Sequence, residues 1–169
     1  MKIAILGVTG HVGKNIQYIF ARENTDQLYL FSRYRNEPNM QLLTYDKFHE
    51  LDYDVIINCI GISDPAKIES EGNSILKLTE DIDSMILEYM QKNTNTKLIN
   101  FSSGAVYGEE FQFPIKDSTL PKNLQENNTI SSYAIAKIKS ESRHRELDKL
   151  NIIDLRLFSF FSRFMDLNS

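Results

Sequence analysis

The chain of 169 residues lacks several features that mark particular classes of protein. It has one cysteine, Cys59, and so cannot form an internal disulfide, which points to a reducing cytoplasm. No hydrophobic run approaches the ~18 residues of a membrane-spanning helix. The apolar residues 2–6 are too few for the core of a signal peptide. We therefore expect a cytoplasmic protein with no membrane partner.

An excess of basic charge is also missing. The formal net charge is −4, and the one crowded basic stretch, residues 143–145, is interleaved with Glu141 and Glu146. This pattern is typical of a solvated helix face and does not form the basic patch that indicates nucleic-acid binding. The three histidines show no metal-ligand spacing, so no metal site is predicted. Cys59 lies in an apolar run and is expected to be a small buried side chain rather than a nucleophile.

What the sequence does contain is an alternation of strand-like and helix-like segments. Short apolar, β-rich runs predict six strands, at residues 2–6, 28–31, 41–44, 55–60, 98–101 and 152–157. Helical spacing of apolar residues, or a capping serine, predicts helices over about 11–23, over 75–90, and from Tyr133 to about Leu150 after Ser131 or Ser132. Residues 109–130 are polar, contain two prolines and predict a long loop.

This alternation predicts an α/β fold. We expect a doubly wound, mostly parallel, Rossmann-like sheet in three α/β/α layers, forming a single domain over residues 1–169. Ligands of such sheets bind at the carboxyl ends of the strands. Gly7, Gly61, Ser102, Ser103 and Phe158 all lie at predicted strand ends.

The first predicted strand runs into Gly7-Val8-Thr9-Gly10-His11-Val12-Gly13, which opens a helix. Gly7 permits a tight turn, Gly10 lets the backbone approach a phosphate, and Gly13 lets the helix pack close to the sheet. Free N–H groups at the helix start would face the anion. The segment predicts a dinucleotide site, with a glycine-rich turn without ligand as the alternative.

The end of the second predicted strand bears on which dinucleotide binds. An acidic side chain there would bind the ribose diol of NAD, whereas an arginine suits the 2′-phosphate of NADP. Arg33 lies just after this strand, and the first acidic residue that follows the strand is Glu37. This favours NADP, with NAD as the second option. Alternatively, Arg33 is only a solvated surface side chain.

Tyr133 and Lys137 are four residues apart and share a helix face. A nearby ammonium would lower the pKa of the tyrosine, so that it could exchange a proton near neutral pH. A lone Tyr-x-x-x-Lys is a weak signal. Its weight comes from its position after the strand end at Ser102 and Ser103 and before the last predicted strand.

As a set, these motifs give the chain a resemblance to the short-chain dehydrogenase/reductases, in particular the extended, epimerase/dehydratase-like branch. The matching pieces, which span essentially the whole chain, are the glycine spacing, Ser103-x-x-Val106-Tyr107-Gly108, Tyr133-x-x-x-Lys137 and Leu155-Arg156-Leu157-Phe158. The resemblance implies an NAD(P)-dependent oxidoreductase, epimerase or dehydratase. Its small-molecule substrate would be a nucleotide sugar, and a homodimer is a candidate assembly.

The resemblance also implies roles for single residues. Tyr133 would be the general acid/base, Lys137 would hold the nicotinamide ribose and lower the pKa of the tyrosine, and Ser103 would hydrogen-bond the substrate oxygen. Contacts with the cofactor are implied for a wider set, namely Gly7, Thr9, Gly10, His11, Val12, Gly13, Arg33, Ile60, Gly61, Tyr133, Lys137 and Phe158.

Three departures from the family pattern bear on function. Asp81 stands where the family often has asparagine, and residues 159–163 lack the usual Asn-x-Tyr-Gly-Pro. The chain also stops where the family builds a small substrate domain, so we expect that domain to be absent or truncated. A truncated product of a longer chain is favoured over a natural short enzyme. These departures motivate a second hypothesis, a non-catalytic NAD(P)-binding module for sensing or assembly.

Overall fold

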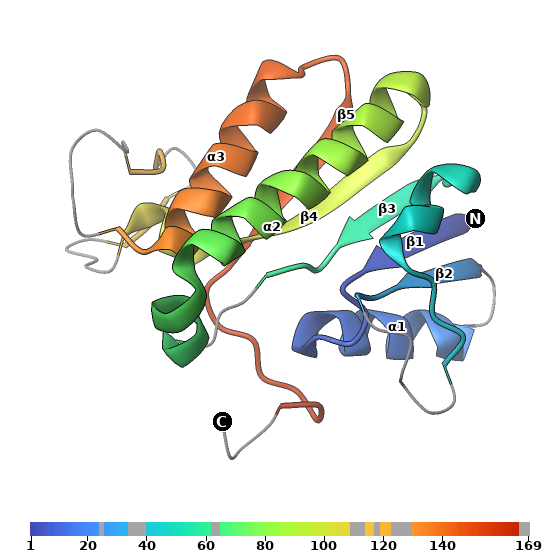
Figure 1. Cartoon of the computed structure of the whole chain (residues 1–169), viewed down its shortest axis with the longest axis horizontal. Helices are drawn as coiled ribbons and strands as arrows, with labels where there is room; N and C mark the ends of the chain where they lie inside the picture. Colours follow the sequence, from blue (N-terminus) through green and yellow to red (C-terminus); the bar gives the residue numbers. More distant parts are fainter. Residues whose placement is uncertain are drawn as a thin grey trace.

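The computed structural model describes residues 1–23, 26–33, 40–61, 65–108, 114–116, 119–122 and 130–165. Its centre is a five-stranded sheet, with strands in the order β2-β1-β3-β4-β5 and all neighbours parallel (Figure 1). The strands are β1 (Lys2–Leu6), β2 (Gln27–Phe31), β3 (Val55–Asn58), β4 (Lys97–Ser103) and β5 (Asn151–Leu157). The predicted α/β class and parallel sheet are confirmed.

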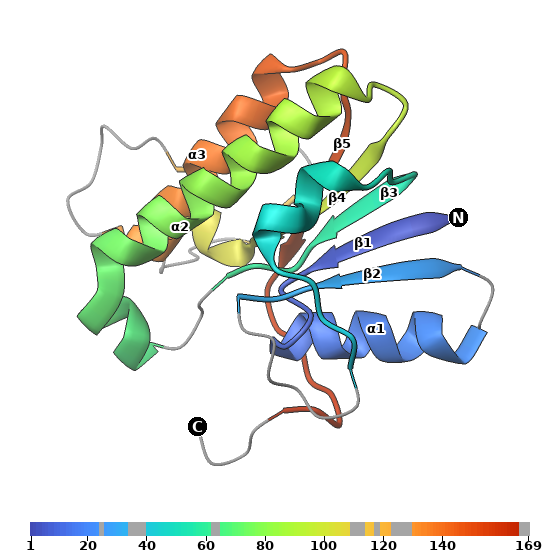
Figure 2. The ribbon, with the colours of Figure 1, turned by 45° about the vertical axis from the view of Figure 1, so that its right-hand side comes forward.

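Helices cover both faces of this sheet, which confirms the three predicted layers. Helix α1 (His11–Glu23) lies on one face, while α2 (Pro65–Lys92) and α3 (Ser132–Glu146) lie side by side on the other (Figures 1 and 2). Two short 3-10 helices, η1 (Tyr45–Glu50) and η2 (Gly104–Tyr107), complete the described elements. No described helix is both long and apolar enough to cross a bilayer.

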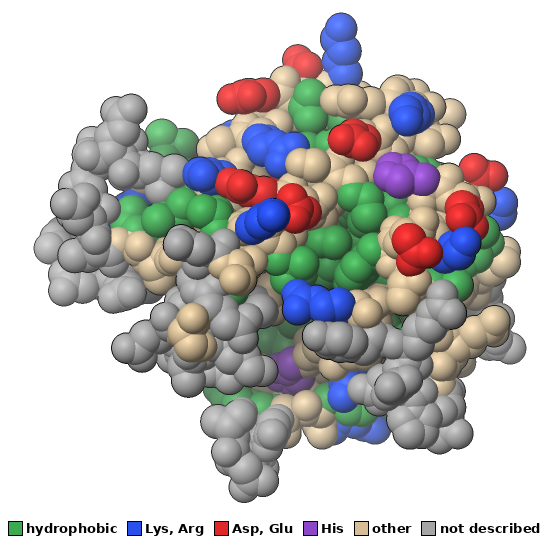
Figure 3. All heavy atoms as spheres, in the orientation of Figure 1, with side chains coloured by type: hydrophobic (Ala, Val, Ile, Leu, Met, Phe, Trp, Pro, Cys, Tyr) green, Lys and Arg blue, Asp and Glu red, His purple; other side chains and the backbone are tan. Residues whose placement is uncertain are grey.

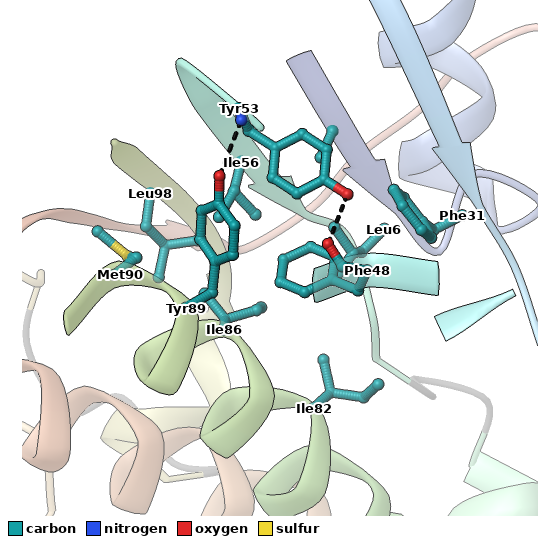
Figure 4. Packing of buried hydrophobic residues seen from close by; sticks show 11 residues of the cluster. Leu6, Phe31, Phe48, Tyr53, Ile56, Ile82, Ile86, Tyr89, Met90 and Leu98 are labelled. Carbon is teal, nitrogen blue, oxygen red and sulfur yellow. Dashed lines mark hydrogen bonds between the residues drawn. The ribbon is translucent and has the colours of Figure 1, made fainter. Parts of the chain in front are cut away.

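The alternation of side chains along β1 separates two cores. Ala4 and Leu6 face α2 and belong to the larger cluster, where Ile86 of α2 is fully buried (Figure 4). Ile3 and Ile5 face α1 and pack with its partly buried apolar side chains. Successive strand residues point to opposite faces, so a strand covered on both sides must be apolar throughout.

Aromatic rings fill the larger cluster next to η1. Phe48 is fully buried and lies with its ring centroid 5.1 Å from that of Tyr53. The Tyr53 hydroxyl donates to the Phe48 carbonyl at 2.8 Å, and the Tyr53 amide donates to the Tyr89 hydroxyl at 2.9 Å (Figure 4). These two bonds satisfy the polar ends of buried phenols and fix η1 against α2.

The prediction of a strand at residues 41–44 is wrong, because these residues form only an isolated bridge. Leu43 forms a single parallel bridge with Phe31, and its amide and carbonyl bond to Leu30 and Ser32 at 2.8 and 3.0 Å. The ladder cannot grow, because η1 begins at Tyr45 and turns the chain away from β2.

Other predicted boundaries also shift, most of all the start of the second helix, which the sequence predicts at residue 75 and which lies ten residues earlier. Helix α2 begins at Pro65, since proline is accepted in a first helical turn. Helix α3 ends at Glu146, and Ser131 is its N-cap, accepting from the Ala134 amide at 3.3 Å. Of the predicted loop 109–130, only residues 114–116, 119–122 and 130 lie inside the described part, and they are neither helix nor strand.

The solvated face predicted for residues 143–145 is only partly correct. Arg145 is exposed, but His144 is 4% exposed and points into the molecule. Charged side chains of both signs do cover the outer side of α2 and α3 (Figure 3). There Lys139 and Glu80 form an exposed ion pair at 3.0 Å.

Candidate active site

A cavity of about 250 Å³ lies where the carboxyl ends of the strands meet the start of α1. It brings together predicted site residues that are far apart in the sequence: Gly10, His11, Val12, Ile60, Gly61, Ser103, Tyr133, Lys137 and Phe158. Cys59, Phe101, Ser102, Leu157, Ser159 and Phe160 complete the lining. This is the edge of a parallel sheet at which ligands bind.

The glycine turn at one wall is built from close backbone contacts. Gly7 has φ +75°, and a Cβ at Gly13 would lie 2.3 Å from the Gly7 carbonyl oxygen and 2.7 Å from the Cα of Val8. A side chain at Gly10 would meet only the Gly7 carbonyl oxygen, at 3.3 Å, and would otherwise enter open space. A turn this tight, opening directly into α1, fits the approach of a pyrophosphate to backbone amides.

Tyr133 lies in the first turn of α3, opposite the end of β4. It is hydrogen-bonded to Ser103, whose Oγ also accepts from the Ala105 amide at 3.2 Å and caps η2. Burial raises the pKa of Tyr133, and the bond to Ser103 lowers it by a smaller amount. The predicted lowering of this pKa by Lys137 is wrong for the structure as it stands.

The reason lies in the orientation of the lysine. Lys137 is 3% exposed, and its Nζ donates to the backbone carbonyls of Ile60 and Phe101 at 3.0 and 2.8 Å. The Nζ lies 5.9 Å from the centre of the Tyr133 ring. Burial lowers the pKa of Lys137 to about 8, against the opposing effect of carboxylates led by Asp154. The ammonium therefore links the segment that follows β3 to the last residues of β4.

Cys59 lies on the floor of the cavity and is partly buried. Burial raises the pKa of its thiol to about 12, and the Lys137 charge only partly offsets this. A thiol this difficult to ionise is a poor nucleophile, as expected from its apolar surroundings.

The wall opposite α3 comes from residues 158–165, which fold back across the start of α1. Phe158 is 57% exposed, and the Phe160 ring centroid lies 5.0 Å from that of His11. The His11 Nε2 lies 2.7 Å from the Ser162 hydroxyl. Phe161 is 79% exposed. The sequence shows no periodicity that would predict this return of the chain.

Four predicted cofactor contacts lie outside the cavity lining. Gly7 and Gly13 form the base of the glycine turn, and the Thr9 hydroxyl lies 3.3 Å from that of Ser32. Arg33 is exposed and lies two residues beyond β2, at the same edge of the sheet.

Asp81 lies away from this site. It is exposed and lines a groove on the outer side of α2 and α3, so it has no contact with the cavity. Within the described residues, no group of histidine, cysteine and carboxylate side chains is arranged to hold a metal ion.

Sequence reasoning missed a second layer behind the cavity. Glu141, Arg156 and Tyr107 form a connected polar cluster there, and Ser102 links it to β4. One signal was present in the sequence: Glu141 lies four residues after Lys137 and continues the helix face of Tyr133 and Lys137.

Several solved structures share this fold. A UDP-N-acetylglucosamine 4-epimerase from Methanobrevibacter ruminantium M1 superposes with a TM-score of 0.78 at 22% identity, covering 99% of this chain and 58% of that one. The UDP-glucose 4-epimerase from Bifidobacterium longum, in complex with NAD+ and UDP, gives 0.74 at 17% identity, with coverages of 92% and 52%. RMD from Pseudomonas aeruginosa, complexed with NADPH, gives 0.68 at 20% identity, with coverages of 94% and 54%.

The chain thus spans little more than half the length of these structures. None of the curated proteins compared with the chain matches it. The sequence itself matches a family over residues 3–168, which is nearly its whole length. The chain belongs to the NAD dependent epimerase/dehydratase family.

Proposed function

We propose that this protein is an NAD(P)-dependent oxidoreductase, epimerase or dehydratase that acts on a nucleotide sugar. The observation that carries the proposal is the convergence of Ser103, Tyr133 and Lys137 on one cavity whose other wall is the glycine turn. Membership of the family supports a nicotinamide cofactor. UDP and NAD+ in the Bifidobacterium longum structure support a nucleotide-linked substrate.

The three side chains have separable tasks in this proposal. Tyr133 moves the proton between its hydroxyl and a hydroxyl or carbonyl oxygen of the substrate. Ser103 holds the same oxygen and, through its bond to Tyr133, keeps the phenol oriented. Lys137, fixed on two backbone carbonyls, places a positive charge below the reacting centre. A bound nicotinamide would supply hydride acceptance and donation.

The residues of the glycine turn fit the cofactor. Gly7, Gly10 and Gly13 hold the backbone close to where a pyrophosphate would lie. The amides of His11 and Val12 lie in the first turn of α1, where a backbone N–H has no acceptor within the helix. Arg33, exposed at the end of β2, favours NADP through its charge.

The central test is the change Tyr133→Phe. We expect wild-type chain to bind NADPH, measured by fluorescence titration, and to turn over members of a panel of UDP-linked sugars. Removing the phenol should lower kcat by about 10²- to 10⁴-fold while leaving NADPH affinity within a few-fold, because only proton transfer is lost. Unchanged turnover would contradict the assigned role.

The same titration separates the two hypotheses. Binding of NADPH or NADH without turnover of any sugar nucleotide would favour the non-catalytic module. Binding of neither dinucleotide would reject both.

Cofactor choice has its own test in the change Arg33→Ser. Loss of a charge-assisted contact with the 2′-phosphate should weaken NADPH binding by about tenfold or more and leave NADH binding unchanged. Arg22→Ser is the matched control, because Arg22 is an exposed arginine at the far end of α1. Equal losses for both dinucleotides, or for both variants, would reject the NADP preference.

A further inference from the structure

Helix α3 presents three ionisable side chains to the end of β4 in a single row. Tyr133, Lys137 and Glu141 are spaced four residues apart, so they lie one above another on one face. Each contacts a different one of the last three residues of β4. Tyr133 contacts the side chain of Ser103. Lys137 contacts the carbonyl of Phe101, and Glu141 contacts the side chain of Ser102. The proposed function uses the first two members of this row and leaves the third without a task.

Both carboxylate oxygens of Glu141 accept hydrogen bonds from neighbouring side chains. Its side chain is 1% exposed, and its Oε1 accepts from the Ser102 hydroxyl at 2.6 Å and from the Arg156 Nε at 2.9 Å. Its Oε2 accepts from the Arg156 Nη2 at 2.6 Å and from the Arg145 Nη1 at 3.3 Å. A buried ion pair of this kind contributes little net stability, because desolvation of both charges offsets their attraction. It does fix geometry, since the two-pronged Arg156 contact allows one orientation only.

Arg156 carries the constraint to the opposite wall of the cavity. Its Nη1 donates to the Tyr107 hydroxyl, and its guanidinium carbon lies 4.9 Å from the centre of the Tyr107 ring. The Tyr107 ring in turn stacks on Phe158, with centroids 6.0 Å apart and planes 14° apart. Phe158 lines the cavity, so Glu141 is connected to both the Ser103 side and the Phe158 side of the site.

We propose that Glu141 is a positioning residue of this site. Glu141 binds Ser102 on one side and Arg156 on the other. These contacts fix the position of the last residues of β4 relative to α3, so that the Ser103 hydroxyl contacts Tyr133. Ser102 and Ser103 are adjacent, and Ser103 leads directly into η2, so a displacement at Ser102 moves Ser103 with it. Only the catalytic consequence rests on the proposed function, because the contacts exist without it.

The test follows the titration of Tyr133 in Glu141→Gln and Ser102→Ala. The full chain is labelled with ring ¹³C-tyrosine, the Tyr133 resonance is identified by its loss in Tyr133→Phe, and circular dichroism confirms folding across the pH range. Loosening the bond from Ser103 should raise the apparent pKa of Tyr133 by about half to one pH unit in both variants. The double variant should show no larger change than either single one, because both act through the same contact.

Lys139→Gln is the matched control. It also removes one charge from α3, but Lys139 points outward to Glu80 and touches nothing in the row. Its Tyr133 titration should equal that of wild type. If turnover is measurable, Glu141→Gln should lower kcat about five- to tenfold with little change in KM.

Two results would overturn the proposal. One is an unchanged Tyr133 titration in both variants, which would leave Glu141 with a purely structural role even if the melting temperature fell. The other is an equal change in Lys139→Gln. If Glu141→Gln does not fold, Ser102→Ala decides alone. None of these readings needs substrate, so absence of turnover in the wild-type chain would count against the proposed function and not against this inference.

Discussion

Gly13 is the residue at which the chain tolerates the least change. An added Cβ would lie 2.3 Å from the carbonyl oxygen of Gly7 and 2.7 Å from the Cα of Val8. Both are backbone atoms, which cannot swing aside as a flexible side chain would. We expect Gly13→Ala to lower the free energy of unfolding by about 3 kcal/mol, near the top of the range for overpacking. Urea unfolding followed by circular dichroism measures this.

Gly10→Ala is the control for that change. The added methyl group would meet a single atom, the Gly7 carbonyl oxygen, at 3.3 Å. Its free energy of unfolding should stay within about 1 kcal/mol of wild type, because one such contact relaxes with a small shift. Equal losses in the two variants would mean that the close packing of α1 on the turn is not what requires Gly13.

The sequence predicts the residues of the glycine turn better than it predicts the contacts of the side chains on α3. Gly13 follows from spacing alone, because a glycine at that position of a strand-turn-helix segment has a steric reason. The direction of Lys137 does not follow, since its partners are the backbone carbonyls of Ile60 and Phe101. A carbonyl is present at every residue, so no sequence pattern identifies the two that accept from the lysine.

Where α2, α3 and β5 meet, one buried imidazole lies between two carboxylates. The Nδ1 of His144 lies 2.9 Å from Asp154 on β5, and its Nε2 lies 2.8 Å from Asp83 on α2. Burial alone would lower the pKa of His144. The hydrogen bonds to Asp154 and Asp83 outweigh it and raise the pKa to about 9. The three elements are therefore held together by a charge that disappears at alkaline pH.

This contact predicts how stability depends on pH. Because the folded-state pKa of His144 is above its unfolded value, the contribution is fully present below about pH 6.5 and is lost as pH rises through about 9. The loss is on the order of 3 kcal/mol, from 1.36 kcal/mol per pH unit. Thermal unfolding across this window should show a falling melting temperature in wild type and a much flatter profile in His144→Gln.

Two comparisons make that profile interpretable. His49→Gln, which changes an exposed histidine, should keep the wild-type slope. Lys137 acts in the opposite sense above about pH 8, because its pKa is lowered, but it is common to all three proteins and cancels in the difference. A wild-type slope in His144→Gln would contradict the assignment.

At the level of elements, sequence identifies what periodicity encodes and misses what contacts decide. Strands β1 and β3, which are buried at every residue except the first, follow from apolar runs, and helix α1 follows from the spacing of its apolar residues. His144 does not, since it lies in a stretch of charges that reads as a solvated face, and only the packing of α3 against α2 turns it inward.

For the whole molecule, the size of the cavity matters. At about 250 Å³ it is below the roughly 300–1,000 Å³ of most small-molecule sites. Its outer boundary at the start of α1 is the returning segment 158–165, of which Phe158, Ser159 and Phe160 line the cavity. We therefore expect a dinucleotide that reaches from the glycine turn to Tyr133 to displace this segment outward.

Ser162 makes side-chain contacts that hold the segment against α1, alongside the bond from the Arg163 Nη1 to the Tyr18 hydroxyl at 2.9 Å. The Ser162 hydroxyl lies 2.7 Å from both the His11 Nε2 and the Asn15 Nδ2, and it accepts from the Phe164 amide at 3.2 Å. Ser162→Ala removes all three contacts, each worth about 1 kcal/mol. Stopped-flow fluorescence should then show NADPH associating several-fold faster than with wild type, whereas Ser142→Ala, on the outer side of α3, should leave the rate unchanged. An unchanged or slower rate in Ser162→Ala would show that the segment already lies where the bound state needs it.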